Sequence, residues 1–317
     1  MSRGWFEQSE RGGALAVGLL ARAILALGSR AGQLLIAPGT ALFFAVSPAA
    51  RAASRDFLAR ARGRPATTAE VFRHFLSFAS VVFDRLFMLT GRTDGYRIDI
   101  VGLGPLQKTL EAGGGCVLLG AHLGSFDVLR ALSRQSPVRI RPLMYQRNGG
   151  ALSRLFAKLD PRLDADIIAI GTSATMLEVR ESVARGEVVG ILGDRAPRDQ
   201  KCLPTPFFGA PALFPTGPII LASMLAVPSY LCFGIRTGPR RYRIHLEPFA
   251  DAITLNRATR QADLQHWLSR YAQRLEHHAR ENPYNWFNFF DFWKTGEAPV
   301  RARAGPMPTG LGTSAPV

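Results

Sequence analysis

The residues best suited to chemistry are a histidine and an aspartate in the segment 113–132, GGGCVLLGAHLGSFDVLRAL. His122 and Asp127 are five positions apart, which would place them on different faces of one continuous helix with about 3.6 residues per turn. They can meet only if His122 lies in a loop and Asp127 in the first turn of a helix. We therefore predict that Asp127 accepts a hydrogen bond from one imidazole nitrogen, which leaves the other nitrogen as a general base.

A histidine base of this kind needs no serine or cysteine nucleophile. An acceptor hydroxyl or amine that loses its proton to His122 could attack a thioester directly through a tetrahedral oxyanion. Gly124 gives the backbone room beside that oxyanion, and Ser125 is a good N-cap for the helix whose amide groups would stabilise it. The spacing alone also arises by chance, in which case His122 is a loop histidine beside a helix-start carboxylate.

The elements that must position these residues form an α/β pattern. Thr67 and Glu70 have capping-box spacing and begin a helix that runs to about Leu89. From residue 97 onward, short β-rich runs alternate with helices, which predicts a mixed, mostly parallel sheet flanked by helices. Strands are expected at 97–101, 115–120, 139–145, 167–170, 188–192 and 229–234, an antiparallel strand at 241–247, and helices near 126–133, 151–159, 174–184, 215–225 and 260–280.

The N-terminal part is apolar and then basic. Residues 14–47 are the most apolar stretch of the chain. Two arginines and Pro38 divide it into pieces shorter than the roughly 20 apolar residues of a spanning helix. The stretch as a whole would either span the membrane once or lie in the interface as a hairpin. The basic segment 51–62 either faces a cytoplasmic leaflet or packs on the domain as an amphipathic helix. We predict a helical membrane-associating region at 1–65, an α/β domain at 66–298 and a disordered tail at 299–317.

The overall charge predicts an anionic partner. The chain has 39 Lys and Arg against 24 Asp and Glu, a net charge of +15. Many arginines are spread between apolar residues, which favours an anionic membrane surface over nucleic acid. The three cysteines are far apart and have no metal-ligand spacing, so neither a metal site nor a disulfide framework is predicted.

Five segments together resemble a known family. The chain is similar to the lysophospholipid acyltransferase superfamily, with its HxxxxD motif, and within it to the lipid A biosynthesis acyltransferases. The segments are HLGSFD at 122–127, YQRNGGALSRLF at 145–156, LGDRAP at 192–197, PFFGAPALFPTGP at 206–218 and NPYNWFNFFDFW at 282–293.

The resemblance implies an acyltransferase domain at 66–298 that uses His122 and Asp127. It implies acyl-acyl carrier protein or acyl-CoA as the donor, a lipid or glycolipid as the acceptor, no cofactor, and a site on the cytoplasmic face of a bacterial inner membrane. Gly193-Asp194-Arg195 stands where common lipid A enzymes carry Asp-Gln, so the acceptor remains open.

Further site residues are expected at strand ends, where ligands of open α/β sheets gather. Arg147 matches a family arginine that contacts the acceptor phosphate or the oxyanion, and Asp194 and Arg195 end the next apolar strand in the same way; their alternative is a surface turn. Phe207 and Phe208 either line the acyl groove or belong to the core. Thr216 either belongs to the same groove or is only an N-cap.

Two other functions would account for parts of this sequence. A glycerophospholipid acyltransferase of the lysophosphatidic acid type would share the motif, but its Phe-Pro-Glu-Gly-Thr-like block appears here as FPTGP at 214–218, without the glutamate. A non-catalytic basic module that binds nucleic acid or membrane would need clustered basic and aromatic residues and no His122. The aromatic segment 286–293 would either anchor in a membrane interface or pack across the domain.

Overall fold

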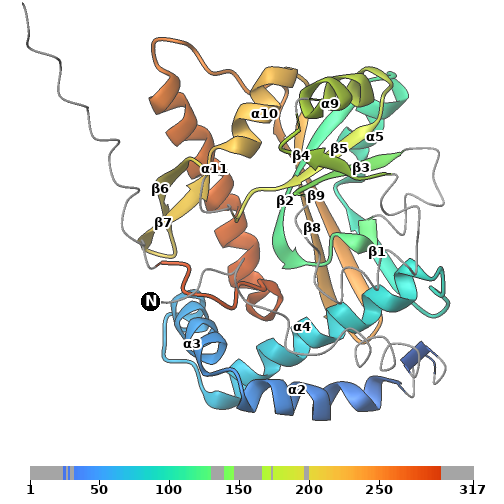
Figure 1. Ribbon diagram of the computed structural model, residues 1–317, viewed down its shortest axis with the longest axis vertical. Coiled ribbons are helices and arrows are strands. Elements are labelled where there is room, and N and C mark those ends of the chain that lie inside the picture. Colours follow the sequence, from blue (N-terminus) through green and yellow to red (C-terminus); the bar gives the residue numbers. More distant parts are fainter. Residues whose placement is uncertain are drawn as a thin grey trace, which may run out of the picture.

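The computed structural model of this 317-residue protein describes residues 24, 25, 28, 32–129, 139–145, 166–172, 174–195 and 200–293. A seven-stranded sheet with the order β1-β9-β8-β2-β5-β3-β4 forms its centre (Figure 1). The strands are β1 (Arg97–Val101), β2 (Cys116–Gly124), β3 (Ile140–Tyr145), β4 (Ile168–Ile170), β5 (Val188–Leu192), β8 (Ser229–Gly238) and β9 (Arg241–Ala250).

The pairing of these strands confirms the predicted fold class. β2 is parallel to both of its neighbours, β5 and β8, and the pairs β3–β5, β3–β4 and β1–β9 are parallel as well. Only β8 and β9 pair in antiparallel fashion within this sheet, as expected for the strand that begins at Arg241. The result is a mixed, mostly parallel sheet flanked by helices.

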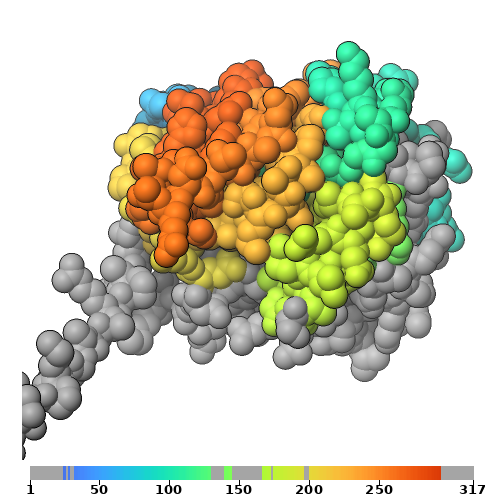
Figure 2. Space-filling model, turned by 90° about the horizontal axis from the view of Figure 1, so that it is seen from above, coloured from blue at the N-terminus to red at the C-terminus, as the bar shows by residue number. Residues whose placement is uncertain are grey.

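Helices cover the sheet at both ends and on its faces. α2 (Ile36–Ala45), α3 (Pro48–Arg62) and α4 (Thr68–Leu89) lie together below the sheet in Figure 1, and α9 (Thr175–Ala184) and α10 (Gly217–Leu225) lie at the opposite end. Seen from above, α5 (Leu103–Glu111) and α9 lie next to each other, where the chain enters β2 and β5 (Figure 2). α11 (Arg260–Glu281) and the short helix η3 (Pro283–Asn285) lead to the aromatic C-terminal segment.

The predicted start of α4 is confirmed in detail. The Thr67 amide donates to Glu70 Oε2 at 2.8 Å, and the Glu70 amide donates to Thr67 Oγ1 at 3.3 Å. This reciprocal capping box satisfies backbone donors that the first helical turn leaves without partners.

Two structural features were not predicted. Helix α5 follows Gly102, whose φ of 80° only glycine adopts readily. The hairpin of β6 (Cys202–Phe207) and β7 (Ala210–Pro215) turns at Phe208 and Gly209, with φ of 50° and 77°. Two-residue hairpin turns with positive φ usually carry Asn-Gly or Asp-Gly, so the large apolar Phe208 concealed this turn.

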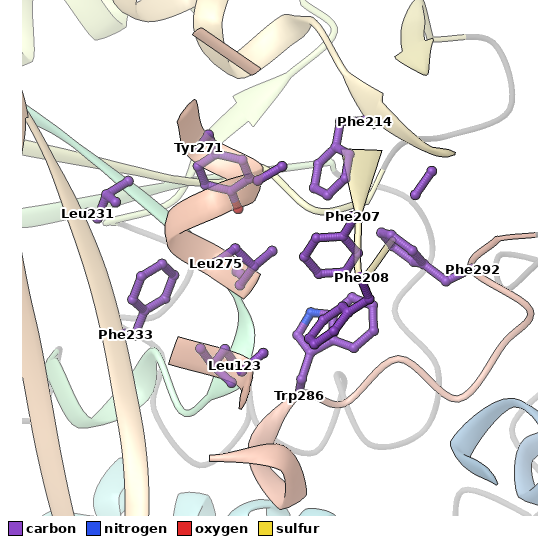
Figure 3. Close-up of a cluster of buried hydrophobic side chains, with 14 of the residues drawn as sticks. Leu123, Phe207, Phe208, Phe214, Leu231, Phe233, Tyr271, Leu275, Trp286 and Phe292 are labelled. Carbon is purple, nitrogen blue, oxygen red and sulfur yellow. The ribbon is translucent and has the colours of Figure 1, made fainter. Parts of the chain in front are cut away.

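The largest hydrophobic core surrounds Trp286, which is fully buried. Its ring centroid lies 5.3 Å from that of Phe207 and 4.7 Å from that of Phe292 (Figure 3). The centroid of Phe57 also lies 4.7 Å away. The C-terminal aromatic residues Trp286, Phe287 and Phe292 therefore pack across the domain, which was one of the two predicted alternatives.

The N-terminal helices that the structure describes are too short or too polar to cross a membrane singly. In the described part of the chain, no single helix is long and apolar enough to do so. The segments 33–45 and 48–62 taken together have the length and composition of a span, but they are bent by 101° at their break.

Candidate active site

His122 lies at the end of β2 and not in the predicted loop. β2 continues to Gly124 because its last residues are paired on both sides, although its register against β8 shifts between Gly120 and Gly124. On the side of the C-terminal segment, the Phe287 amide donates to the His122 carbonyl at 2.8 Å, and Leu123 forms a bridge with Trp286. The backbone of His122 is therefore fixed by strand pairing.

The carboxylate that contacts the His122 ring is Asp194. His122 Nδ1 lies 2.8 Å from Asp194 Oδ1, and the His122 amide donates to Asp194 Oδ2 at 3.0 Å. Asp194 follows β5, the parallel neighbour of β2, so the two side chains meet at the carboxyl ends of adjacent strands. Because a carboxylate only accepts hydrogen bonds, it fixes the ring as the Nδ1–H tautomer.

Asp194 is buried but well satisfied. Its side chain is fully buried, and Oδ2 also accepts hydrogen bonds from Trp286 Nε1 at 3.2 Å and from Asn288 Nδ2 at 3.1 Å. A buried carboxylate is stable only with such partners, since an unpaired one would lose several kcal/mol of hydration, roughly.

Asp127, the predicted partner of His122, lies against another residue. Its Oδ2 lies 3.0 Å from Nε of Arg85, which projects from α4. The prediction assumed that the chain leaves the sheet at His122, whereas β2 continues two residues further, to Gly124. The Nδ1 position is thereby taken by Asp194, and Asp127 faces α4.

The electrostatics of the pair suit a neutral base. Burial and the positive charge of Arg195 lower the pKa of His122, against the opposing effect of Asp194. Burial alone would raise the pKa of Asp194, but its interactions with His122 and Arg195 hold it well below its usual value. His122 keeps 29% of its side chain exposed, so a proton donor can reach it. The neutral imidazole and the ionised carboxylate therefore coexist near pH 7.

The chain is similar to one known family over most of its length. The sequence model of a family described as bacterial lipid A biosynthesis acyltransferase matches residues 64–295. The chain belongs to this family. No match is found among curated individual proteins. The family indicates an acyltransferase that acts on a lipid with an acyl donor, and it confirms the preference for the lipid A branch.

Arg195 bonds to the C-terminal segment. Its Nε donates to Asn288 Oδ1, and its Nη2 donates to the carbonyl of Phe287. Burial lowers its pKa to about 10, against the opposing effect of Asp194, so it is still a cation at neutral pH. The alternative of a surface turn at Asp194 and Arg195 is wrong, because the Asp194 side chain is fully buried and Arg195 bonds to the C-terminal segment.

Ser125 was expected to cap a helix, and Gly124 to give backbone room beside the oxyanion. Their observed contacts differ from both expectations. The buried Ser125 hydroxyl has no hydrogen-bond partner within the described structure, and its amide donates to the Gly234 carbonyl at 2.8 Å. Gly124 has a φ of 75°, and a Cβ there would lie 2.0 Å from the Gly234 oxygen. This glycine is required by the close approach of β2 and β8.

The groove candidates lie in the core. Phe207 and Phe208 are buried in the cluster around Trp286, which supports the core alternative for both. Thr216 occupies the N-cap position of α10, but its hydroxyl donates to the Lys201 carbonyl at 3.1 Å and makes no capping bond. Arg147 lies outside the described residues.

Sequence reasoning missed three residues whose side chains contact the predicted carboxylates. Trp286 and Asn288 bind Asp194, and Arg85 pairs with Asp127. The segment NPYNWFN contributes to the family resemblance and predicts an aromatic anchor or core segment, but nothing in the spacing of Asn288 relates it to Asp194, which lies 94 positions earlier. Within the described chain, no cluster of three His, Cys, Asp or Glu side chains is arranged to hold a metal ion.

Proposed function

We propose that this protein transfers a fatty acyl group from acyl-acyl carrier protein or acyl-CoA to a hydroxyl or amine of a lipid or glycolipid, with His122 as general base and Asp194 as its orienting carboxylate. The observation that carries the mechanism is the double contact of the buried Asp194 with His122, through Nδ1 and through the backbone amide. It supports a role for His122 that the family match leaves open.

In the proposed reaction, Nε2 carries the lone pair because Nδ1–H donates to Asp194. The acceptor oxygen or nitrogen attacks the thioester carbonyl carbon while Nε2 removes its proton, which gives a tetrahedral oxyanion and an imidazolium. The oxyanion then collapses, the C–S bond breaks, and the leaving thiolate takes the proton from Nε2. Asp194 stays ionised and stabilises the imidazolium between the two steps.

The oxyanion requires positive charge or backbone donors. Arg195 is close enough to His122 to lower its pKa, so its field also favours a negative charge formed beside the ring. Arg147 remains the second candidate on the strength of the family resemblance. The net charge of +15 favours acidic donors such as a carrier protein or CoA.

Membrane association forms part of this proposal, with α2 as the contact. This helix contains no charged residue, and an apolar surface extends along it and its flanks, with Leu42 69% and Phe43 44% exposed. The next helix, α3, carries Arg51 and Arg55, which can meet anionic headgroups. An apolar helix beside arginines fits a helix that lies in the cytoplasmic face of an anionic inner membrane.

The first experiment tests acyl transfer. Wild-type protein and a His122→Ala variant are incubated with radiolabelled acyl-acyl carrier protein or acyl-CoA and a total lipid extract of the source cell, and labelled lipids are separated by chromatography. A His245→Ala variant is the control, because this histidine lies on β9 outside the site. We expect the label to vanish only with His122→Ala. Equal labelling by all three proteins would refute the His122 mechanism, and no labelling with either donor would favour the basic binding module.

A second experiment tests the membrane contact. Co-sedimentation with phosphatidylglycerol-containing vesicles should be strong for wild type and lost when Leu42 and Phe43 are both replaced by Glu. Leu177→Glu is the control, because Leu177 is 63% exposed on α9, at the other end of the molecule (Figure 1). Equal loss in both variants would show that α2 is not the membrane contact.

A further inference from the structure

The side chain of Asn288 connects the two charged residues that follow β5. Its Nδ2 donates to Asp194 Oδ2 at 3.1 Å, and its Oδ1 accepts from Arg195 Nε. Asn288 is 1% exposed, so water cannot take over either bond. Asp194 in turn contacts His122, so the Asp194 side chain alone connects Asn288 to the base.

The chemistry of these neighbours explains why an amide stands at this position. An ionised carboxylate can only accept a hydrogen bond, and a guanidinium can only donate one. A carboxamide offers one donor and one acceptor on the same planar group, so it satisfies both neighbours and adds no charge. The same two neighbours also fix the orientation of the amide.

Backbone contacts hold Asn288 in place. The Phe287 amide donates to the His122 carbonyl at 2.8 Å, and the Phe287 carbonyl accepts from Arg195. The Trp286 indole also donates to Asp194 Oδ2, at 3.2 Å. Three consecutive residues from the C-terminal segment therefore contact His122, Asp194 and Arg195.

We propose that Asn288 is a positioning residue of the active site, whose amide fixes the Asp194 carboxylate against His122 and holds Arg195 beside it. This inference rests on the proposed function, because it assigns Asn288 a role through the catalytic base. The C-terminal segment thereby completes a site whose other residues come from the ends of β2 and β5.

The chain offers a matched control in Asn285. This asparagine lies three residues earlier, is also buried, and also makes two hydrogen bonds: Oδ1 accepts from the Arg236 amide at 2.9 Å, and Nδ2 donates to the Arg236 carbonyl at 3.3 Å. Both of its bonds end on the backbone of β8. Asn285→Asp therefore alters the same loop in the same way without touching Asp194 or Arg195.

The decisive measurement is an NMR titration of the histidine rings in full-length protein. The chain has six histidines, and the His122 signal is assigned by its absence from a His122→Gln spectrum. Asn288→Asp places a second carboxylate beside Asp194, which favours the imidazolium, so the pKa of His122 should rise by about one unit or more. Asn285→Asp should leave it unchanged.

An uncharged variant keeps the test available if Asn288→Asp does not fold. Asn288→Leu removes both hydrogen bonds and buries no new charge, and it should lower kcat at least about tenfold with little change in KM for the acyl donor, because orientation and not binding is lost. Asn285→Leu should give a far smaller loss of kcat.

The outcomes separate this inference from the proposed function. An unchanged His122 pKa in Asn288→Asp, an equal shift in Asn285→Asp, or equal kcat losses in the two leucine variants would overturn the positioning role. The other case is a protein that transfers no acyl group even as wild type but shows the expected pKa shift in Asn288→Asp. That result would refute the proposed function and would still support the contact between Asn288 and the His122–Asp194 pair.

Discussion

Asp194 contacts His122 at two points, through Oδ1 to the ring nitrogen Nδ1 and through Oδ2 to the backbone amide. The second contact matters because it fixes the carboxylate relative to the strand and not only to a rotatable ring. The two oxygens therefore define both the tautomer and the orientation of the imidazole. Asp127, five residues along the chain, instead pairs with Arg85.

This arrangement predicts unequal effects for two conservative substitutions. Asp194→Asn should lower kcat by about 10²-fold or more, because the amide can donate to Nδ1 and favour the wrong tautomer. Asp127→Asn should have a smaller effect, since its carboxylate lies against Arg85. Steady-state acyl transfer at saturating donor measures both. A larger loss for Asp127→Asn would restore the pairing that the sequence suggested.

The lowered pKa of His122 predicts the acidic side of the pH–rate profile. The base is active when neutral, and its pKa lies below the ordinary value of 6.5, so activity should persist below pH 6.5 and fall only as pH drops through the lowered pKa. The profile of kcat/KM for wild type measures this directly. An acidic limb centred above pH 6.5 would contradict a buried neutral base.

His74 predicts a different pH effect, on stability. It is fully buried on α4, where Nε2 donates to the Trp286 carbonyl at 2.9 Å and Nδ1 accepts from Ser54 Oγ at 2.8 Å. Burial lowers its pKa to about 3, against the opposing hydrogen bond to Trp286. Between pH 6.5 and about 3 the unfolded chain binds a proton that the native ring does not.

The free energy of unfolding should therefore fall by about 1.4 kcal/mol for each pH unit below 6.5 through His74 alone. Urea unfolding of wild type and His74→Gln at several pH values measures this contribution. The His74→Gln variant should be less stable than wild type at pH 7. Below pH 6.5 its free energy of unfolding should fall less steeply with pH than that of wild type, by about 1.4 kcal/mol per pH unit, because one proton fewer is taken up on unfolding. Parallel slopes for the two proteins would show that His74 does not titrate in this way.

Most of the sheet could be predicted from the sequence, because its buried strands are short apolar runs between turn residues. β1 and β5 begin and end where predicted. The hairpin β6–β7 was missed because Phe208 adopts a positive φ without being Gly, Asn or Asp. Its turn depends on the packing of that ring in the Trp286 cluster, which no local pattern reveals.

The site was predictable only in part, for a similar reason. The type and position of His122 suggested a base, and the strand-end rule singled out Asp194 and Arg195. The partner of His122 depends on how far β2 continues, which is decided by its pairing with β8 and with the segment after η3. Asn288 reaches the site through a contact that spans most of the second half of the chain, so spacing could not reveal it.

The close approach of β2 and β8 gives a last prediction, at Gly124. Its φ of 75° would strain an alanine, and a Cβ would also lie 2.0 Å from the Gly234 oxygen. Gly113 separates backbone strain from the steric clash, because it has a φ of 76° but nothing lies within 4 Å of its Cβ position. Gly113→Ala should cost only the backbone strain, about 1–2 kcal/mol.

Gly124→Ala should cost that strain plus about 1–3 kcal/mol for the displacement of β8. Because β2 carries His122 two residues earlier, acyl transfer should fall in Gly124→Ala even under conditions where most of the protein is folded, whereas Gly113→Ala should keep wild-type activity. Thermal unfolding and acyl transfer on both variants measure the two effects. Equal stability losses, with activity retained in both, would mean that the strand end adapts to the methyl group and that the position of His122 does not depend on this contact.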